Sequence, residues 1–293
     1  MKISACIITY NHEAYIRECL DGAISQKLNC NYEIIIGEDL STDNTLKICK
    51  EYAEKYPKIV KILPREKNLG MISNWQSSIY SCQGEYIAIC EGDDYWTDPL
   101  KLQKQVDFLE ANKDYSLCFH NANVIYDDII TKSHLFTKLE DRFYTGVELF
   151  DNWLIPTASV LFRKEALYSE RYVEVCESSK ILYADTPLFI SASFCGKLFG
   201  FSETMSVYRK QAEGMTNNYL KNLFQVCIHY KEIARIFGKE YLLLAKDKVA
   251  SATVLRALSL LKRGRMKEAT KFLVFGLSYA PLLSLKKVLT NIK

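Results

Sequence analysis

Short apolar segments alternate with helical patterns over the first 112 residues, and this alternation limits the possible folds more than any other feature. Near-continuous apolar runs, typical of parallel strands buried on both faces, cover residues 2–9, 33–37, 59–63 and 85–90. Helical patterns lie between or after them, at residues 12–26, 44–55, 71–82 and 98–112. In the last of these helices we expect Asp98 at the N-cap and Pro99 at the first helical position. The alternation predicts a doubly wound α/β sheet with right-handed crossovers.

The pattern changes after this stretch. Residues 115–126 and 156–164 predict two more strands, with a polar loop expected between them at about 127–145. These strands make the expected sheet mixed, although still mostly parallel.

The C-terminal part of the chain differs from the rest in both pattern and charge. From residue 219 onward only helical patterns occur, including an expected helical hairpin around Gly264. Residues 219–293 contain 15 Lys and Arg against 4 Asp and Glu, a net charge of +11, which leaves −8 on residues 1–218. We therefore expect an α/β domain, residues 1–215, and a basic all-helical extension, residues 219–293. This extension is either a cap packed on the α/β domain or a surface for anionic lipid or an acidic glycan.

Three features predict a cytoplasmic protein. Ten cysteines occur without a C-x-x-C pair, which indicates a reducing compartment. The N-terminus enters strand-like sequence directly, without the long apolar segment of a signal peptide. The longest uncharged apolar stretch, Phe272–Leu285, has 14 residues, fewer than the roughly 20 that span a bilayer. Peripheral contact with the inner face of the cell membrane, through the basic extension, stays open.

Polar residues follow three of the predicted parallel strands where the strands end. They are Tyr10 and Asn11, Glu38 and Asp39, and Asp93 and Asp94. Because ligands of open α/β sheets bind outside the carboxyl ends of the strands, we expect these residues to face one crevice. Carboxylates that share a crevice raise each other's pKa unless a cation lies among them, and oxygen ligands suit Mg²⁺ or Mn²⁺. The sequence therefore predicts a divalent metal site that substrate phosphates complete.

Other nucleotide and metal motifs are missing from the sequence. There is no G-x-x-x-x-G-K-[ST], and no G-x-G-x-x-G follows the first predicted strand, which argues against P-loop and dinucleotide-binding proteins. The H-E-x-x-H and C-x-x-C zinc patterns are also absent. We expect no nucleic-acid partner.

Five ordered motifs resemble those of the family 2 glycosyltransferases, which have the GT-A fold. The motifs are ITYNHEAYIRECLDGAISQ, EDLSTDNT, NLGMISNW, EGDDYWTDPLKLQKQ and YADTPLFISASFCGKL…YR, and the resemblance covers roughly residues 1–215. It implies inverting transfer of a sugar from a nucleoside-diphosphate sugar, with a divalent metal on the diphosphate. It also implies a role in building bacterial surface polysaccharides, with a saccharide or a lipid-linked saccharide as acceptor.

The resemblance assigns recognition of the nucleotide base to the first two loops. Thr9, Tyr10 and Asn11 would flank the base, with Tyr10 as the stacking residue. Asp39 resembles the residue that reads the base edge. A carboxylate only accepts hydrogen bonds, so it suits the ring N–H of uracil or thymine, or the N–H pair of guanine. Uridine-linked donors are expected first and thymidine-linked donors second. The alternative for Asp39 is capping of the turn before the helix at 44–55.

The resemblance also assigns residues to the rest of the donor. Asn68 and Gly70 match an N-x-G motif, in which glycine permits close approach of the backbone to the donor. Asp93 would lie toward the ribose and Asp94 toward the metal, with Asp93 as a second metal candidate.

Catalysis and diphosphate binding fall on later residues. Asp185 matches the catalytic base, although an Asp before Thr-Pro is also an ordinary helix N-cap, where the helix dipole would keep the carboxylate ionised. Arg209 is the diphosphate candidate, with ordinary surface pairing as the alternative. Gln211 stands where the family frequently has a histidine.

We interpret the chain as an inverting glycosyltransferase. The alternative is a catalytically silent nucleotide- or glycan-binding module of the same fold, since fold does not prove function. A nucleotidyltransferase is disfavoured, because the first loop lacks a basic Gly-rich segment. We expect loops such as 127–145 and 153–160 to select the sugar and the acceptor.

Overall fold

The computed structural model of the protein describes residues 2–126, 129–211 and 222–291. The chain forms two compact units, one comprising Met1–Val173 and Ala184–Gln211, the other Glu174–Tyr183 and Ala212–Lys293. The predicted domain boundaries at residues 215 and 219 fall outside the described residues, so they stay a prediction.

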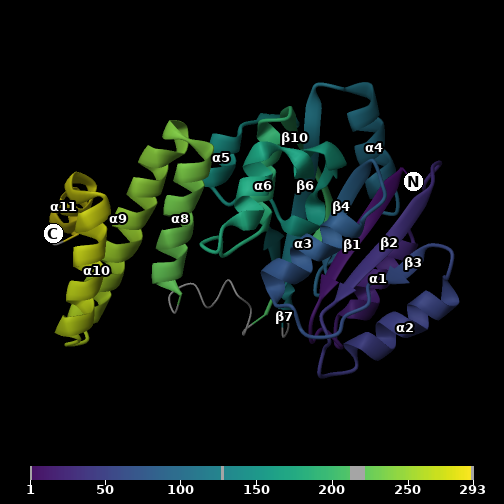
Figure 1. The fold of residues 1–293 in the computed structure, drawn as a ribbon, viewed down its shortest axis with the longest axis horizontal. Helices are drawn as coiled ribbons and strands as arrows, with labels where there is room; N and C mark the ends of the chain where they lie inside the picture. Colours follow the sequence, from purple (N-terminus) through teal and green to yellow (C-terminus); the bar gives the residue numbers. More distant parts are fainter. Residues whose placement is uncertain (1, 127–128, 212–221, 292–293) are drawn as a thin grey trace. The chain divides into compact units, whose positions relative to one another are not determined.

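One mixed sheet forms the centre of the first unit (Figure 1). Its strands lie in the order β3 (Val60–Ile62), β2 (Tyr32–Glu38), β1 (Ile3–Thr9), β4 (Tyr86–Glu91), β9 (Leu161–Arg163), β6 (Tyr115–Tyr126), β10 (Lys197–Lys210) and β5 (Tyr95–Trp96). The first four run parallel, β9 is antiparallel to both neighbours, and β10 is parallel to β6 and antiparallel to β5. Two further strands, β7 (Ile129–Leu135) and β8 (Arg142–Tyr144), pair antiparallel with β6 and β10. The predicted doubly wound, mostly parallel mixed α/β sheet is confirmed.

Helices connect and cover these strands. They are α1 (Ile16–Ile24), α2 (Thr45–Lys55), α3 (Met71–Ser81), α4 (Lys101–Ala111), α5 (Gly146–Asp151), α7 (Asp185–Ser193) and the short 3₁₀ helices η1 (Thr157–Ser159) and η2 (Lys164–Tyr168), while α6 (Glu170–Glu177) crosses the division between the units. The first four confirm the predicted helices except at their ends. Both Asp98 and Pro99 precede α4, contrary to prediction. The Asp98 carboxylate accepts the N–H of Leu100 at 2.8 Å in a turn that leaves Leu100 at the N-cap.

The parallel strands are buried on both faces, as their apolar runs predict. All seven residues of β1 are buried, and so are the first five of β4. Ile3, Ala5 and Ile7 of β1 belong to one core cluster with Ile16 and Leu20 of α1. Full burial of an isoleucine side chain stabilises a protein by about 1.5–3 kcal/mol, so this cluster firmly fixes the strands that carry the loops.

Two predictions for the middle of the chain are wrong. The segment 127–145 is more than a polar loop, because β7 and β8 occupy much of its described part. The segment 156–164 contributes a strand only at β9, since Thr157–Ser159 form a 3₁₀ helix. There the buried Trp96 Nε1 donates to the Ala158 carbonyl at 2.7 Å. Such partners are distant in the sequence, so the local pattern does not reveal them.

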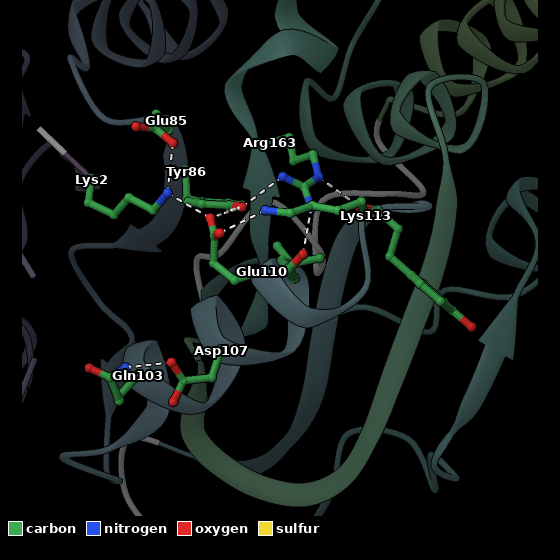
Figure 2. Close-up of polar contacts among 10 residues, drawn as sticks. Lys2, Glu85, Tyr86, Gln103, Asp107, Glu110, Lys113 and Arg163 are labelled. Atoms are coloured by element: carbon green, nitrogen blue, oxygen red, sulfur yellow. Dashed lines mark hydrogen bonds and ion pairs between the residues drawn. The ribbon is translucent and has the colours of Figure 1, made fainter. Parts of the chain in front are cut away.

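A network of hydrogen bonds and ion pairs connects the start of β4 with the end of α4 (Figure 2). Glu110 accepts hydrogen bonds from the Tyr86 hydroxyl at 2.6 Å and from Lys113 Nζ at 2.7 Å. Lys2 forms an ion pair with Glu110 at 2.6 Å, and Arg163 donates to the Tyr86 hydroxyl at 2.7 Å. The hydrogen bonds from Lys113 and Lys2 lower the pKa of Glu110 to about 2. The network lies at the amino ends of β1 and β4, so it braces the sheet edge opposite to the polar loops.

The second unit is helical in its described part. It contains α8 (Leu223–Phe237), α9 (Lys239–Leu261), α10 (Met266–Tyr279) and α11 (Pro281–Asn291), and α9 packs against the other three (Figure 1). Gly264 has a φ of 70° between α9 and α10, which confirms the predicted helical hairpin. The rings of Phe224 and Phe272 stack in the core of the second unit, with 4.3 Å between the ring centres. Across the described residues, every helix is too short or too polar to cross a bilayer.

Candidate active site at the carboxyl ends of the strands

The carboxyl ends of β1, β2 and β4 lie side by side. The register pairs Thr9 with Glu38 across β1 and β2, and Ile8 with Glu91 across β1 and β4. The three loops after these strands therefore start from one edge of the sheet. The predicted polar residues of these loops are brought to that edge.

The loop after β1 is tied to the loop after β2. Asn11, which has a left-handed φ of 54°, accepts the N–H of Thr42 at 2.8 Å through its side-chain oxygen. Its own N–H donates to Ser41 Oγ at 2.9 Å. Asn11 thus holds the two loops together, while the preceding Tyr10 leaves its ring exposed. The hydroxyl of the third predicted residue, Thr9, lies 3.2 Å from His12 Nδ1.

Asp39 holds the segment before α3. Its two carboxylate oxygens accept the N–H groups of Leu69 at 2.7 Å and Gly70 at 2.9 Å. Asn68 returns a hydrogen bond from its side-chain amide to the Asp39 carbonyl at 2.7 Å. Gly70 has a φ of 77°, a conformation that favours glycine. The three predicted residues are therefore brought together, and it is Asp43, not Asp39, that accepts the N–H of Thr45 at the start of α2.

The acids after β4 meet the end of β10. The short strand β5, which directly follows them, pairs with β10 and brings residues 209–211 beside Asp93 and Asp94. Asp94 Oδ1 accepts the N–H of Arg209 at 2.8 Å, and Asp93 Oδ2 accepts from Gln211 Nε2 at 2.8 Å. Within the described part of the chain, Asp94 Oδ2 is buried and has no hydrogen-bond partner. One carboxylate oxygen thus remains available for a ligand.

Arg209 is buried, which argues against ordinary surface pairing. Its guanidinium donates to the Asp93 carbonyl at 2.8 Å and forms an ion pair with Glu18 of α1. It also lies 4.5 Å from the centre of the Tyr15 ring and 5.5 Å from that of Tyr95. The side chain therefore links α1 to the loop that carries Glu91, Asp93 and Asp94, called the acidic loop below. It fixes a positive charge beside these acids.

Two acids at and just after the end of β4 have raised pKa values. Burial, followed by the charges of Asp93 and Asp185, raises the pKa of Glu91 to about 8. Burial, followed by the charges of Asp93 and Glu91, also raises the pKa of Asp94 well above its usual range. The influence of Asp185 on Glu91 indicates that the start of α7 lies near Glu91. The sequence had predicted this concentration of charge.

Asp185 differs in two details from its prediction. It is the first residue of α7, and Ala184 occupies the N-cap position without a side-chain cap. Burial raises the pKa of Asp185, although hydrogen bonds from the backbone of Thr186 and of Asp185 itself oppose this shift. Desolvation is therefore a larger effect on the pKa of Asp185 than its hydrogen bonds at the helix end, and the expectation that the carboxylate is ionised stays a prediction.

The chemistry of the loop fits a divalent cation. Asp94 offers a buried, unpartnered oxygen among acids of raised pKa, and a hard cation would relieve both conditions. Among the described residues, no three Asp, Glu, His or Cys side chains form a ready-made metal cluster. This suits a site in which one or two carboxylates hold the ion and a substrate diphosphate supplies further ligands.

Three contributors to the site were not found from the sequence. Glu18 pairs with Arg209 from 191 positions away, and no local pattern could reveal that contact. Gln211 departs from the family motif, yet its amide binds Asp93. Gly92 packs so tightly that an added Cβ would lie 2.4 Å from Thr9 Oγ1. A glycine between Glu91 and the two aspartates was the available signal for this close packing.

Comparison with protein families identifies the class of this chain. The model of glycosyl transferase family 2 matches residues 4–171. This range contains the loops after β1, β2 and β4 that form most of the candidate site. The chain therefore belongs to glycosyl transferase family 2, as the ordered motifs predict. The structure of the mannosyltransferase PcManGT from Pyrobaculum calidifontis, in complex with GDP-Man and Mn²⁺, is similar with a TM-score of 0.61. That similarity covers 98% of this chain and 80% of the other at 15% identity, so it shows the shared GT-A fold.

Two sequence relatives are informative. An uncharacterized protein of Mycobacterium tuberculosis is 38% identical over 214 residues, which are 73% of this chain and 60% of the relative. The dTDP-rhamnosyl transferase RfbG of Shigella flexneri is 32% identical over 168 residues, 54% of each chain. The matches thus span little more than half the length of these relatives.

Proposed function

We propose that the protein transfers a sugar from a nucleoside-diphosphate sugar to a saccharide or lipid-linked saccharide, with inversion at the anomeric carbon. The observation that carries the proposal is the buried, unpartnered Oδ2 of Asp94 within a cluster of acids. Membership of glycosyl transferase family 2 supports the reaction type. The name of the Shigella relative, a dTDP-rhamnosyl transferase, supports a pyrimidine nucleotide.

The nucleotide base is assigned to the first two loops. Each oxygen of the Asp39 carboxylate already accepts one backbone N–H, but a carboxylate has about four acceptor positions. Capacity remains for the ring N–H of uracil or thymine, while Tyr10 offers an exposed ring for stacking. We assign uridine-linked donors first and thymidine-linked donors second.

The diphosphate is assigned to the acidic loop and Arg209. Asp94, with Asp93 as a second candidate, would hold Mn²⁺ or Mg²⁺, which as a Lewis acid offsets the charge that develops on the leaving diphosphate. Arg209 adds a fixed positive charge at the same place. Its hydrogen bond to the Asp93 carbonyl and its ion pair with Glu18 keep the guanidinium in position without the donor.

Asp185 is assigned the role of general base. It would remove the proton of the acceptor hydroxyl as that oxygen attacks the anomeric carbon from the face opposite the diphosphate. Burial raises the pKa of Asp185, which brings it closer to the pH at which a general base works best. A single displacement of this kind inverts the stereochemistry and needs no covalent enzyme intermediate.

The second unit is assigned a peripheral membrane contact. α11 exposes Leu282, Leu285 and Leu289 on one side, and Lys286 is exposed beside them. An apolar helix face flanked by lysines fits the boundary between acyl chains and anionic headgroups. Binding to liposomes that contain anionic lipid should weaken with salt, because each basic residue contributes about 1 kcal/mol near the surface. Leu285→Asp should reduce sedimentation with liposomes, whereas salt-independent behaviour would contradict this contact.

Release of nucleoside diphosphate from UDP- and dTDP-sugars tests the proposed function. We expect slow release with Mn²⁺ or Mg²⁺, faster release with a suitable acceptor, and no release in EDTA. Asp94→Asn is the matched variant, because it removes the charge and keeps the size of the side chain. A silent binding module would bind the nucleotide and release nothing under any of these conditions.

A further inference from the structure

Three aromatic rings from separate segments meet on the surface of the first unit. Trp153, which follows α5, lies 4.9 Å from Phe136 and 6.0 Å from Tyr208 between ring centres. Phe136 and Tyr208 lie 5.1 Å apart. The planes of each pair are nearly perpendicular, at 76° to 87°, which is the favoured edge-to-face geometry of aromatic pairs.

Trp153 is unusual among the tryptophans of this chain. It is 50% exposed, whereas Trp75 and Trp96 are 4% and 3% exposed. A half-exposed tryptophan on a monomer surface marks a candidate binding position, because such large rings dominate the energetics of interfaces. Its contacts with Phe136 and Tyr208 hold the ring in place, so little conformational entropy would be lost when a ligand binds.

The neighbouring elements connect these rings with the candidate active site. Tyr208 directly precedes Arg209, whose N–H binds Asp94. Trp153 lies two residues beyond α5, and α5 packs against α7, the helix that begins at Asp185. The rings are therefore supported by the same elements that present the proposed metal ligand and the proposed base.

We propose that Trp153, held by Phe136 and Tyr208, is a stacking surface for a sugar ring of the acceptor. A pyranose presents weakly positive C–H groups on its faces and hydroxyl groups at its edges. Aromatic faces carry the negative part of their quadrupole, so they complement the C–H face of a sugar. This inference rests on the proposed function, because it takes the acceptor to be a saccharide. Tyr10, directly after β1, is already assigned to the nucleotide base.

Fluorescence quenching tests the stacking directly. Because Trp75 and Trp96 are buried, acrylamide quenching of the wild-type protein reports mainly on Trp153. We expect methyl β-D-glucopyranoside, methyl α-D-mannopyranoside or methyl α-L-rhamnopyranoside to lower the quenching constant, while UDP with Mn²⁺ alone leaves it unchanged. Protection by UDP alone would overturn the proposal, since Trp153 would then belong to the donor site. The absence of protection by all three glycosides would also overturn it.

Kinetics separate a stacking role from a structural one. Trp153→Ala should raise the KM for a saccharide acceptor about tenfold, the scale of one lost stacking contact, while the KM for the donor and the melting temperature stay the same. Trp153→Phe should recover most of the loss. Tyr168→Ala, which removes an exposed ring outside this cluster, is the matched control and should behave as the wild type. Equal increases of both KM values in Trp153→Ala would contradict the inference. If no donor is turned over at all, the proposed function fails, and the quenching result still decides whether Trp153 binds sugars.

Discussion

Two buried acids at the same edge of the sheet differ in how their carboxylate oxygens are hydrogen-bonded. Asp39 follows β2 and Asp94 lies just beyond β4, and they are only 3% and 1% exposed. Both oxygens of Asp39 accept backbone N–H groups. Asp94 has one oxygen bound by the N–H of Arg209 and, within the described residues, a second that is buried without a partner. The difference teaches that the chain itself can satisfy a buried carboxylate, as at Asp39, whereas the second oxygen of Asp94 is left open to a ligand.

The two environments have different energetic consequences. A carboxylate that accepts two backbone N–H groups stabilises the fold, since hydrogen bonds to charged groups contribute about 1.5–3 kcal/mol each. A buried carboxylate oxygen without a donor is destabilising until a proton or a cation reaches it. The hydrogen bonds of Asp39 therefore fix the conformation of the loop before α3. The open oxygen of Asp94, in contrast, is stabilised only when a proton or a cation binds to it.

Asp185→Asn should have the largest effect of the changes considered, because it removes the proposed base itself. A positioned general base contributes about 10² to 10⁴ in rate, roughly 3 to 5 kcal/mol of barrier, and turnover should fall by that factor. Donor affinity and melting temperature should change little, since asparagine is nearly the same size. Single-turnover kinetics with saturating donor measure the loss. Transfer at close to the wild-type rate would show that another group accepts the proton.

His229 provides a buried group that is satisfied only in its neutral form. Its Nδ1 accepts the N–H of Leu182 at 3.3 Å, and burial lowers its pKa to about 4. The unfolded chain binds a proton near pH 6.5, so the folded protein should lose up to about 3 kcal/mol of stability as the pH falls from 6.5 to 4. Denaturant unfolding across this range measures the effect in the wild type. His229→Gln, which cannot titrate, should show a smaller loss, and an identical pH profile in both proteins would contradict the assignment.

Asp39→Asn and Asp94→Asn should change the free energy of unfolding in opposite directions. Asp39→Asn replaces one acceptor by a donor that faces a backbone N–H, which should destabilise the protein by about 1–3 kcal/mol. Asp94→Asn removes an unsatisfied buried charge, so without added metal it should leave the stability unchanged or raise it. Denaturant unfolding in EDTA compares the two variants. Destabilisation by both to the same extent would mean that Asp94 Oδ2 has a partner after all.

Gly70→Ala should destabilise the protein somewhat less than Asp39→Asn. The left-handed φ of 77° costs an L-residue roughly 1–2 kcal/mol, although an added Cβ would meet no atom within 4 Å. The variant should therefore lose about that much stability, and its donor affinity should fall because the loop held by Asp39 is displaced. Leu69→Ala changes the neighbouring side chain and keeps the Asp39 hydrogen bond, so it serves as a control. Unchanged stability of Gly70→Ala would show that the loop relaxes freely.

The parallel half of the sheet could be predicted from the sequence because the apolar pattern of each strand lies within the strand itself. Near-continuous apolar runs give β1, β2, β3 and β4, and the acids that follow them predict the edge where a ligand would bind. Elements that depend on distant partners could not be predicted in the same way. β7 and β8 form by pairing with β6 and β10, and the 3₁₀ helix at Thr157–Ser159 is held by Trp96. The contact of Glu18 with Arg209 likewise requires the folded chain.

The calorimetric titration of UDP tests the central claim most directly, because the claim is that Asp94 holds a divalent cation which in turn holds the donor diphosphate. The wild type should bind UDP tightly only with Mn²⁺ or Mg²⁺ present and lose that affinity in EDTA. Asp94→Asn should bind UDP with the same weak affinity whether or not the metal is added. A metal-dependent gain in Asp94→Asn equal to that of the wild type would contradict the assignment of the open Asp94 oxygen to the metal.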